Sequence, residues 1–261
     1  MDALEIAIKA AIDAGRTIKD LYERGEIDTQ IKDDRTPVTN ADLASNRIIM
    51  EQLSPTGIPV LSEENLSIPY DERKHWNRLW IVDPLDGTKE FLKRNGEFTV
   101  NIALVEGHLP SLGVIYAPVT GELYFGHSAR GSFKTLVDGK ESNIKQIISG
   151  ADKLPLQHYS PQEKVAVSRS HLNEITENYI LSRHSGPGKP VLVSRGSSLK
   201  MCMVAEGSVA YYPRFGRTME WDTAAGHAIL RYAGKALKGI DKGEELSYNK
   251  VEPLNPDFIA E

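Results

Sequence analysis

Hydrophobic residues in the first part of the chain recur at steps of three and four. From about Asp2 to Arg24 this spacing predicts an amphipathic helix. A second helix is expected up to Leu53, because Thr39 and Asp42 form an approximate capping box at its start. Between the two helices, the alternation at residues 25–35 predicts a short strand. Each helix has one apolar face, so we expect both to cover a sheet.

The period changes to two beyond Phe98. Four β-rich segments separated by turn residues predict an antiparallel sheet: 99–105, 109–116, 122–125 and 131–137. The polar stretch 140–163 then predicts a passage between two halves. Beyond it, strands at 164–167, 190–193 and 209–212 alternate with helices from 171, 197 and 222. We therefore predict an α+β domain at 1–140 and an α/β domain at 141–261.

Two short apolar strands in the first half end in acidic residues. Residues 58–61 lead to Glu63, and residues 80–82 lead to Asp83 and Asp86. Pro84 stiffens the second turn, and the residue after Gly87, Thr88, is predicted to be the N-cap of a helical turn facing an anion. An ordinary Asp-Pro turn with capping residues is an alternative reading of this motif.

A third acidic position lies in the second half of the chain. Asp222 begins a helix that continues with the small residues 224–226, which permit close helix packing. Asp42 and Asp222 each have an alternative role as helix caps. Taken together, however, Glu63, Asp83, Asp86 and Asp222 all lie at element ends, where sites in layered α/β proteins are built.

Carboxylates and a backbone carbonyl are the ligands that Mg²⁺ prefers. Such a site would lower the pKa of a bound water and neutralise charge on a phosphoryl group. A hydroxyl backed by a carboxylate could orient that water, and Thr88 with Asp42 is the predicted pair. The sequence thus favours metal-dependent hydrolysis of a phosphate ester.

Composition excludes several other classes of function. The net charge of −5 comes from interspersed charges, which argues against a nucleic acid polymer or an anionic membrane as partner. Cys202 lies in an apolar run and is expected in the core, and the scattered histidines give no zinc spacing. With neither an 18-residue apolar run nor a basic N-terminal leader, we expect a cytoplasmic protein without an integral membrane segment.

Three motifs resemble those of the magnesium-dependent, lithium-sensitive inositol monophosphatase superfamily: Ser62–Glu64, Asp83–Thr88 and Trp221–Gly226. The resemblance implies a layered αβαβα sandwich, with an antiparallel sheet in the first half and a mixed sheet in the second. It also implies metal ligation by Glu63, Asp83, the Leu85 carbonyl, Asp86 and Asp222. Asp42, Thr88 and Glu63 would then be catalytic, with Gly87, Thr88 and Asp222 near the substrate. Ser62 stands where the family usually has Gly.

Within the superfamily, three further motifs resemble the bacterial 3'(2'),5'-bisphosphate nucleotidase branch: 87–91, 167–171 and 196–200. This implies cleavage of 3'-phosphoadenosine 5'-phosphate to AMP and phosphate, a reaction linked to sulfate assimilation. Ser197, Ser198 and Lys200 would hold the second phosphate at a helix start. The alternative is a serine cap with a solvated lysine. Candidates for nucleoside contact are Tyr211, Tyr212, Arg217 and Glu220.

Two other functions remain open. An inositol or sugar monophosphatase would use the same chemistry, and a nucleotide- or metal-binding protein would need only part of it. The intact pair Thr88 and Asp42 argues against the binding protein. Some relatives associate with the inner face of the cell membrane, so a peripheral position is compatible with the resemblance. The sequence determines neither the oligomeric state nor the number of magnesium ions.

Overall fold

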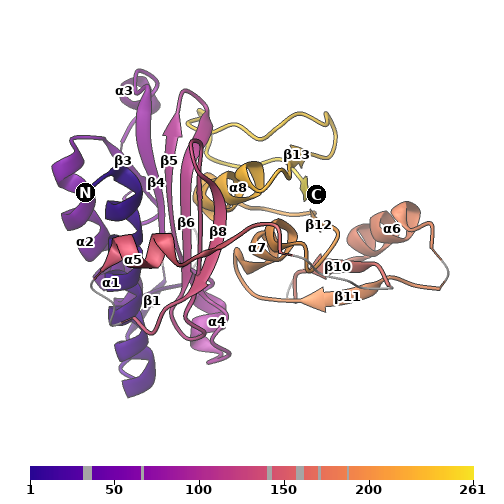
Figure 1. The fold of residues 1–261 in the computed structure, drawn as a ribbon, viewed down its shortest axis with the longest axis horizontal. Coiled ribbons are helices and arrows are strands. Elements are labelled where there is room, and N and C mark those ends of the chain that lie inside the picture. Colours follow the sequence, from indigo (N-terminus) through magenta and orange to yellow (C-terminus); the bar gives the residue numbers. More distant parts are fainter. Residues whose placement is uncertain (32–36, 66–67, 140–142, 157–161, 170–171, 187) are drawn as a thin grey trace.

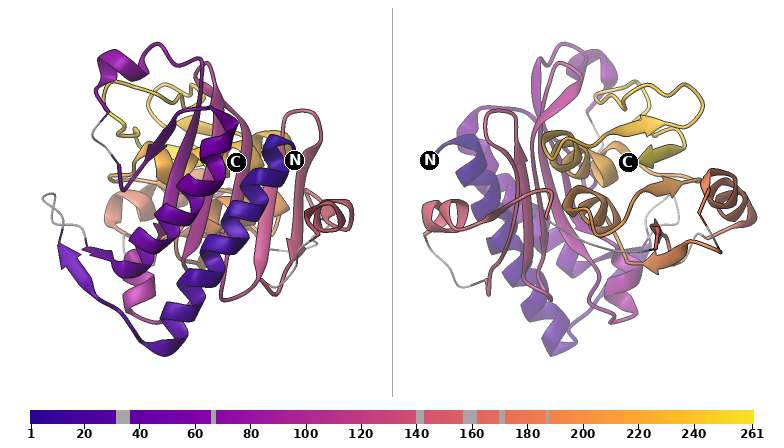
Figure 2. Two further views of the ribbon diagram at one scale, coloured as in Figure 1. Left: turned by 90° about the vertical axis from the view of Figure 1, so that its left-hand side faces the viewer. Right: turned by 45° about the vertical axis from the view of Figure 1, so that its right-hand side comes forward.

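The chain forms five alternating layers of helices and sheets (Figure 1). The computed structural model describes residues 1–31, 37–65, 68–139, 143–156, 162–169, 172–186 and 188–261. Helices α1 and α2 cover the outer face of a large sheet, and α7 and α8 lie between this sheet and a smaller one, which carries α6 on its far side (Figures 1 and 2). The predicted αβαβα sandwich is confirmed.

The described helices have the following bounds: α1 Ala3–Arg24, α2 Asn40–Leu53, a 3-10 turn Ser54–Thr56, α3 Tyr70–Arg73, α4 Thr88–Leu92, α5 Ile144–Ser149, α6 Glu174–Arg183, α7 Leu199–Glu206 and α8 Glu220–Tyr232. Among the residues that the structure describes, none of these helices is long and apolar enough to cross a membrane.

The large sheet has seven strands in the order β3-β4-β5-β6-β7-β8-β9. Their bounds are β3 Val60–Ser62, β4 Arg78–Asp86, β5 Thr99–Glu106, β6 Leu109–Ala117, β7 Glu122–His127, β8 Gly131–Leu136 and β9 Asp152–Lys153. Among the described strand pairs of this sheet, β3–β4 is parallel and the others are antiparallel, as predicted for residues 99–137. A separate hairpin pairs β1 Thr29–Ile31 with β2 Pro37–Thr39.

Both faces of the large sheet are apolar. On the outer face, α1 buries Leu4, Ile8 and Ile18, and its N-cap Asp2 accepts a hydrogen bond from the Glu5 backbone N–H. On the inner face α8 lies close to the strands, because a Cβ on Gly113 would stand 2.3 Å from the Ala225 carbonyl oxygen. Gly226 of α8 is likewise close to α7, because a Cβ there would stand 2.6 Å from Met201 Cε, so this small residue permits the close packing that was predicted.

The smaller sheet is mixed, as predicted. β10 Lys164–Val167 runs parallel to β11 Val191–Ser194, while β12 Tyr212–Arg214, β14 Phe258–Ala260 and β13 Leu237–Gly239 form an antiparallel set. A parallel bridge between Val165 and Tyr211 joins the two groups.

Several features of the second half depart from the sequence reading. The strand expected at 209–212 is found at Tyr212–Arg214, and the helix expected from Asp222 already begins at Glu220. The strands β13 and β14 were not predicted. Helix α6 begins at Glu174, capped by Asn173, and its expected start at His171 lies outside the described residues.

The passage between the halves has structure of its own. Helix α5 packs against α1, and β9 pairs with β8 at the edge of the large sheet. Residues 144–153 thus associate with elements of the first half. The division at residue 140 stays a prediction.

Candidate active site

The turn after the buried strand β4 carries most of the predicted site. The pairing of β4 with β5 shifts register between Asp83 and Asp86, so the strand is irregular where its carboxylates lie. Gly87 follows with φ +94°, a left-handed conformation that favours glycine. Gly87, and not Thr88 as predicted, is the N-cap of α4, because its backbone takes the sharp turn and Thr88 becomes the first helical residue.

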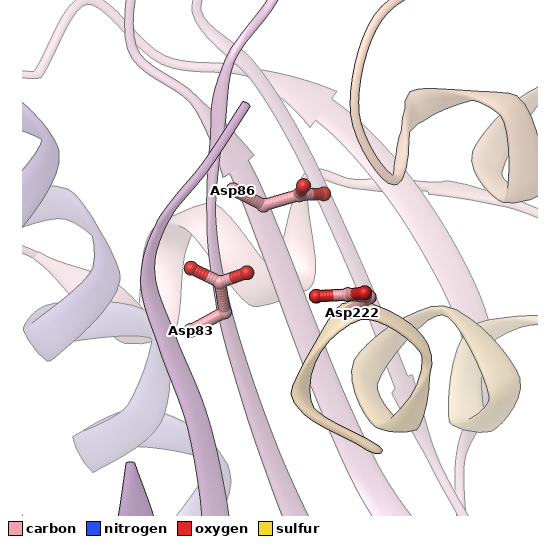
Figure 3. A group of neighbouring side chains, drawn as sticks. All are labelled: Asp83, Asp86 and Asp222. Carbon is pink, nitrogen blue, oxygen red and sulfur yellow. The ribbon is translucent and has the colours of Figure 1, made fainter. Parts of the chain in front are cut away.

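Three carboxylates converge beside this turn. Asp83, Asp86 and Asp222 each offer an oxygen within 4.8 Å of the others, and Figure 3 shows Asp222 facing the pair from the start of α8. Asp222 also accepts a hydrogen bond from the Met219 backbone N–H at 2.7 Å. It therefore both caps its helix and projects into the site.

Electrostatics distinguish this cluster from ordinary surface acids. Burial, with the neighbouring charges of Glu63, Asp86 and Asp222, raises the pKa of Asp83 well above its usual range. Burial and the Asp86 charge do the same for the pKa of Asp222. Converging carboxylates in a partly dry site repel one another unless a cation is bound. The oxygen donor set fits a hard divalent cation.

Glu63 and Leu85 lie beside the three aspartates. Glu63 follows β3 and lines the same cleft, and its backbone N–H donates to the Val82 carbonyl at 3.1 Å. Leu85 also lines the cleft, and its backbone N–H donates to Asp83 Oδ1 at 3.1 Å. All five residues predicted as metal ligands thus line one cleft, and among the described residues the three aspartates have carboxylate oxygens within 4.8 Å of one another.

Asp42 connects a helix cap to the site. Its Oδ2 accepts hydrogen bonds from the Thr39 backbone N–H at 2.8 Å and the Thr39 hydroxyl at 2.5 Å, which completes the predicted capping box. The Thr88 hydroxyl donates to Asp42 Oδ1 at 3.3 Å. Burial raises the pKa of Asp42. The predicted pair, Thr88 and Asp42, is therefore joined by a hydrogen bond.

A cleft of about 430 Å³ lies above these residues. We call the part of its lining with Glu63, Asp83, Asp86 and Asp222 the acidic end. We call the part with Arg169, Arg195, Lys200, Arg214 and Arg217, all from the second half, the basic end. The two parts adjoin, because the charge of Asp86 acts on Lys200 and that of Arg214 acts on Asp222. Such a cleft can place one anionic group over the carboxylates and another against the cations.

Predicted nucleoside contacts divide into two groups. Tyr212 and Arg217 line the cleft. Tyr211 packs with Val165 and Ile180 under α6. Glu220 is fully buried and accepts hydrogen bonds from the backbone N–H groups of residues 249 and 250, so it was wrongly proposed as a base contact.

The loop before α7 is bound to the protein itself. The Ser197 hydroxyl lies 2.5 Å from that of Thr99, and the Ser198 hydroxyl donates to Asn101 Oδ1 at 2.9 Å. Lys200 Nζ donates to the carbonyls of Arg195 and Ser197, at 3.0 and 2.6 Å. The lysine is buried, so the alternative of a solvated Lys200 is wrong.

Arg214 is a candidate that the sequence reading missed. It lies on β12, is buried, and lines the cleft, yet its Nε has no hydrogen-bond partner among the described residues. Burial lowers the pKa of Lys200 to about 8, and the Arg214 charge contributes in the same direction, which places the two cations near each other. A buried donor without a partner is costly, which suggests that a ligand supplies one.

Comparisons with known proteins agree with this geometry. The model of the inositol monophosphatase family matches residues 2–257. The 3'(2'),5'-bisphosphate nucleotidase CysQ of Salmonella typhimurium is 42% identical over 259 residues, which cover 98% of each chain.

Two solved structures are also similar. The crystal structure of CysQ from Bacteroides thetaiotaomicron is 47% identical with a TM-score of 0.89, covering 98% of this chain and 95% of that one. The IMPase of Thermotoga maritima is 23% identical with a TM-score of 0.75, covering 100% and 92%, and shares the fold.

Proposed function

The chain belongs to the inositol monophosphatase family, and from that premise we propose that it is a magnesium-dependent 3'(2'),5'-bisphosphate nucleotidase. Its substrate would be 3'-phosphoadenosine 5'-phosphate, cleaved to AMP and phosphate. The identity of 42% to a nucleotidase over nearly the whole chain supports the activity. The observation that carries the substrate class is the cleft that is lined both by clustered carboxylates and by the buried cations Lys200 and Arg214.

Five ligands would hold Mg²⁺ at the acidic end: the side chains of Glu63, Asp83, Asp86 and Asp222 and the Leu85 carbonyl. All five residues line the cleft. When bound, the cation supplies charge neutralisation at the phosphoryl group and a lowered pKa for water. The high pKa values of Asp83 and Asp222 accord with a site whose like charges are balanced by a bound cation.

Thr88 and Asp42 would orient the attacking water. Because the Thr88 hydroxyl donates its proton to Asp42 Oδ1, its oxygen lone pairs are free to accept a hydrogen bond from a water in the cleft. Asp42 is held in turn by Thr39, so its carboxylate keeps one orientation. This pair can receive the proton that the water loses during attack on the 3'-phosphate.

The basic end would hold the phosphate that is not cleaved. Arg214 lines the cleft and its buried Nε has no hydrogen-bond partner among the described residues, while Lys200 also lines the cleft and donates to the loop before α7. A guanidinium suits a phosphate because its donors match two phosphate oxygens. Ser197 and Ser198 would contribute mainly through the loop backbone, because their hydroxyls are engaged by Thr99 and Asn101.

Phosphate release at one fixed Mg²⁺ concentration tests the function. We expect the protein to hydrolyse 3'-phosphoadenosine 5'-phosphate with a higher kcat/KM than inositol 1-phosphate or fructose 1,6-bisphosphate. Preference for either of the other esters would favour a monophosphatase or a sugar bisphosphatase. Release from none of the three would favour a binding protein.

A further inference from the structure

Asp86 belongs to a closed ring of hydrogen bonds that joins the two halves of the chain. The Ser198 backbone N–H donates to Asp86 Oδ2 at 2.7 Å, and Asn101 Nδ2 donates to the same oxygen at 3.3 Å. The Ser198 hydroxyl closes the ring by donating to Asn101 Oδ1 at 2.9 Å. Both hydrogen bonds to Asp86 therefore end on one carboxylate oxygen.

Asn101 is well placed to control this geometry. It is 1% exposed on β5, directly across from Asp83 in the β4–β5 ladder. The Thr99 hydroxyl also donates to Asn101 Oδ1 at 2.9 Å. The Asp86 carboxylate can only accept, which settles the orientation of the amide and leaves Oδ1 toward the two hydroxyls. The NH₂ group must then face Asp86.

We propose that Asn101 is a positioning residue for the metal site: it fixes the Asp86 carboxylate through Oδ2 and leaves Oδ1 to bind the cation. This inference rests on the proposed function, since it concerns the ligand set named there. A carboxylate with one oxygen tethered loses little rotational freedom when it binds a metal. Groups that orient metal ligands in this way commonly raise metal affinity.

The ring also makes the metal site depend on the second half of the chain. Ser198 is the N-cap of α7, and its loop is held by Lys200 through the Arg195 and Ser197 carbonyls. Asp86 and Asn101 lie on the large sheet. Loosening this loop would therefore remove one of the two donors that hold Asp86.

Calorimetric titration of Mg²⁺ into the substrate-free protein tests the proposal. We expect Asn101→Leu, nearly equal in size to asparagine, to weaken Mg²⁺ binding by about tenfold or more. Thr99→Val is the matched control, because the Thr99 hydroxyl contacts Asn101 and Ser198 but has no described hydrogen bond to the Asp86 carboxylate. It should bind Mg²⁺ within about threefold of the wild type. Asn101→Ala provides a second test if the leucine variant does not fold.

Two results would overturn the inference. One is wild-type Mg²⁺ affinity in folded Asn101→Leu or Asn101→Ala, and the other is an equal loss in Thr99→Val, which would indicate general packing. Because no substrate is present, these results are independent of which ester the protein hydrolyses. A failure of the proposed function would be seen instead in the phosphate release assay.

Discussion

Single side chains in this site serve local structure and the cleft at once. Asp42 completes a capping box and also accepts from Thr88, and Asp222 accepts from the Met219 N–H while facing Asp83 and Asp86. A cap needs only one carboxylate oxygen, so the other remains available. The choice between a cap and a site residue, which the sequence left open at both positions, is therefore not exclusive.

Replacement of Thr88 tests the predicted relay. Thr88→Ala should lower kcat by about 100-fold with little change in KM, because a hydroxyl that orients water acts in the transition state. Thr88→Ser keeps the hydroxyl and should retain most of the turnover. Steady-state kinetics on 3'-phosphoadenosine 5'-phosphate measures both variants. Near-wild-type turnover by Thr88→Ala would remove the pair from the mechanism.

Polar residues on strands are where the sequence was least informative. Arg214 on β12 and Asn101 on β5 look like ordinary interruptions of apolar segments. Their importance comes from partners far away in the chain, such as Ser198 for Asn101. By contrast, the clustered carboxylates lie at the ends of apolar strands or at the start of a helix, which a local pattern can predict.

The loop before α7 is attached to the large sheet by a partly buried ion network. Arg195 pairs with Glu122 on β7, with an Nη2 to Oε2 distance of 2.8 Å, and Lys134 on β8 bridges Glu122 and Glu206. Burial alone would raise the pKa of Glu122. The hydrogen bond from Arg195 and the charges of Arg195 and Lys134 overcome this effect and lower its pKa to about 2.

This network predicts a pH dependence of stability. Because the folded pKa of Glu122 lies below its usual 4.5, its contribution is complete above about pH 4.5 and disappears as the pH falls toward 2. Glu122→Gln should therefore lower the free energy of unfolding at pH 7 by up to about 3 kcal/mol, with a smaller difference from wild type at pH 3. Urea denaturation at both pH values measures this.

Glu106 is a suitable control for that experiment. It pairs with Arg78 on the same sheet, but both side chains are about half exposed. Glu106→Gln should change stability by less than about 1 kcal/mol at either pH. An equal loss in Glu122→Gln at pH 7 and pH 3 would contradict the assigned ionisation.

Elements with strong periodicity were predictable, and short strands were not. The amphipathic pattern located α1 to within a residue, since burial against the sheet requires one apolar face. The strands β13 and β14 have three residues each and pair across a long stretch of sequence. No local pattern encodes such a pairing. Thr88 was misassigned as a cap because the left-handed backbone at Gly87 makes Gly87 the N-cap of α4. A Cβ on Gly87 would also stand 3.3 Å from Ser197 Cβ, a long-range contact that no local pattern encodes.

The complete molecule forms a cleft in which the two halves have different chemistry. Most of the carboxylates come from strand ends of the first half, and the buried cations come from the second. Asp222 is the exception, since it reaches back from α8 to the acidic end. This division suits a substrate with two phosphates, because each phosphate can be bound by a different half. An inositol monophosphate has no second phosphate, so it would leave the basic end without a partner.

The use of the basic end can be measured with one substitution and two substrates. Arg214→Gln should lower kcat/KM for 3'-phosphoadenosine 5'-phosphate by about tenfold or more, because a buried charge-assisted contact to phosphate is lost. It should leave kcat/KM for inositol 1-phosphate within about threefold of the wild type. Arg130→Gln, an exposed arginine paired with Asp2, is the control. Equal losses on both substrates would contradict a cleft that holds the second phosphate at Arg214.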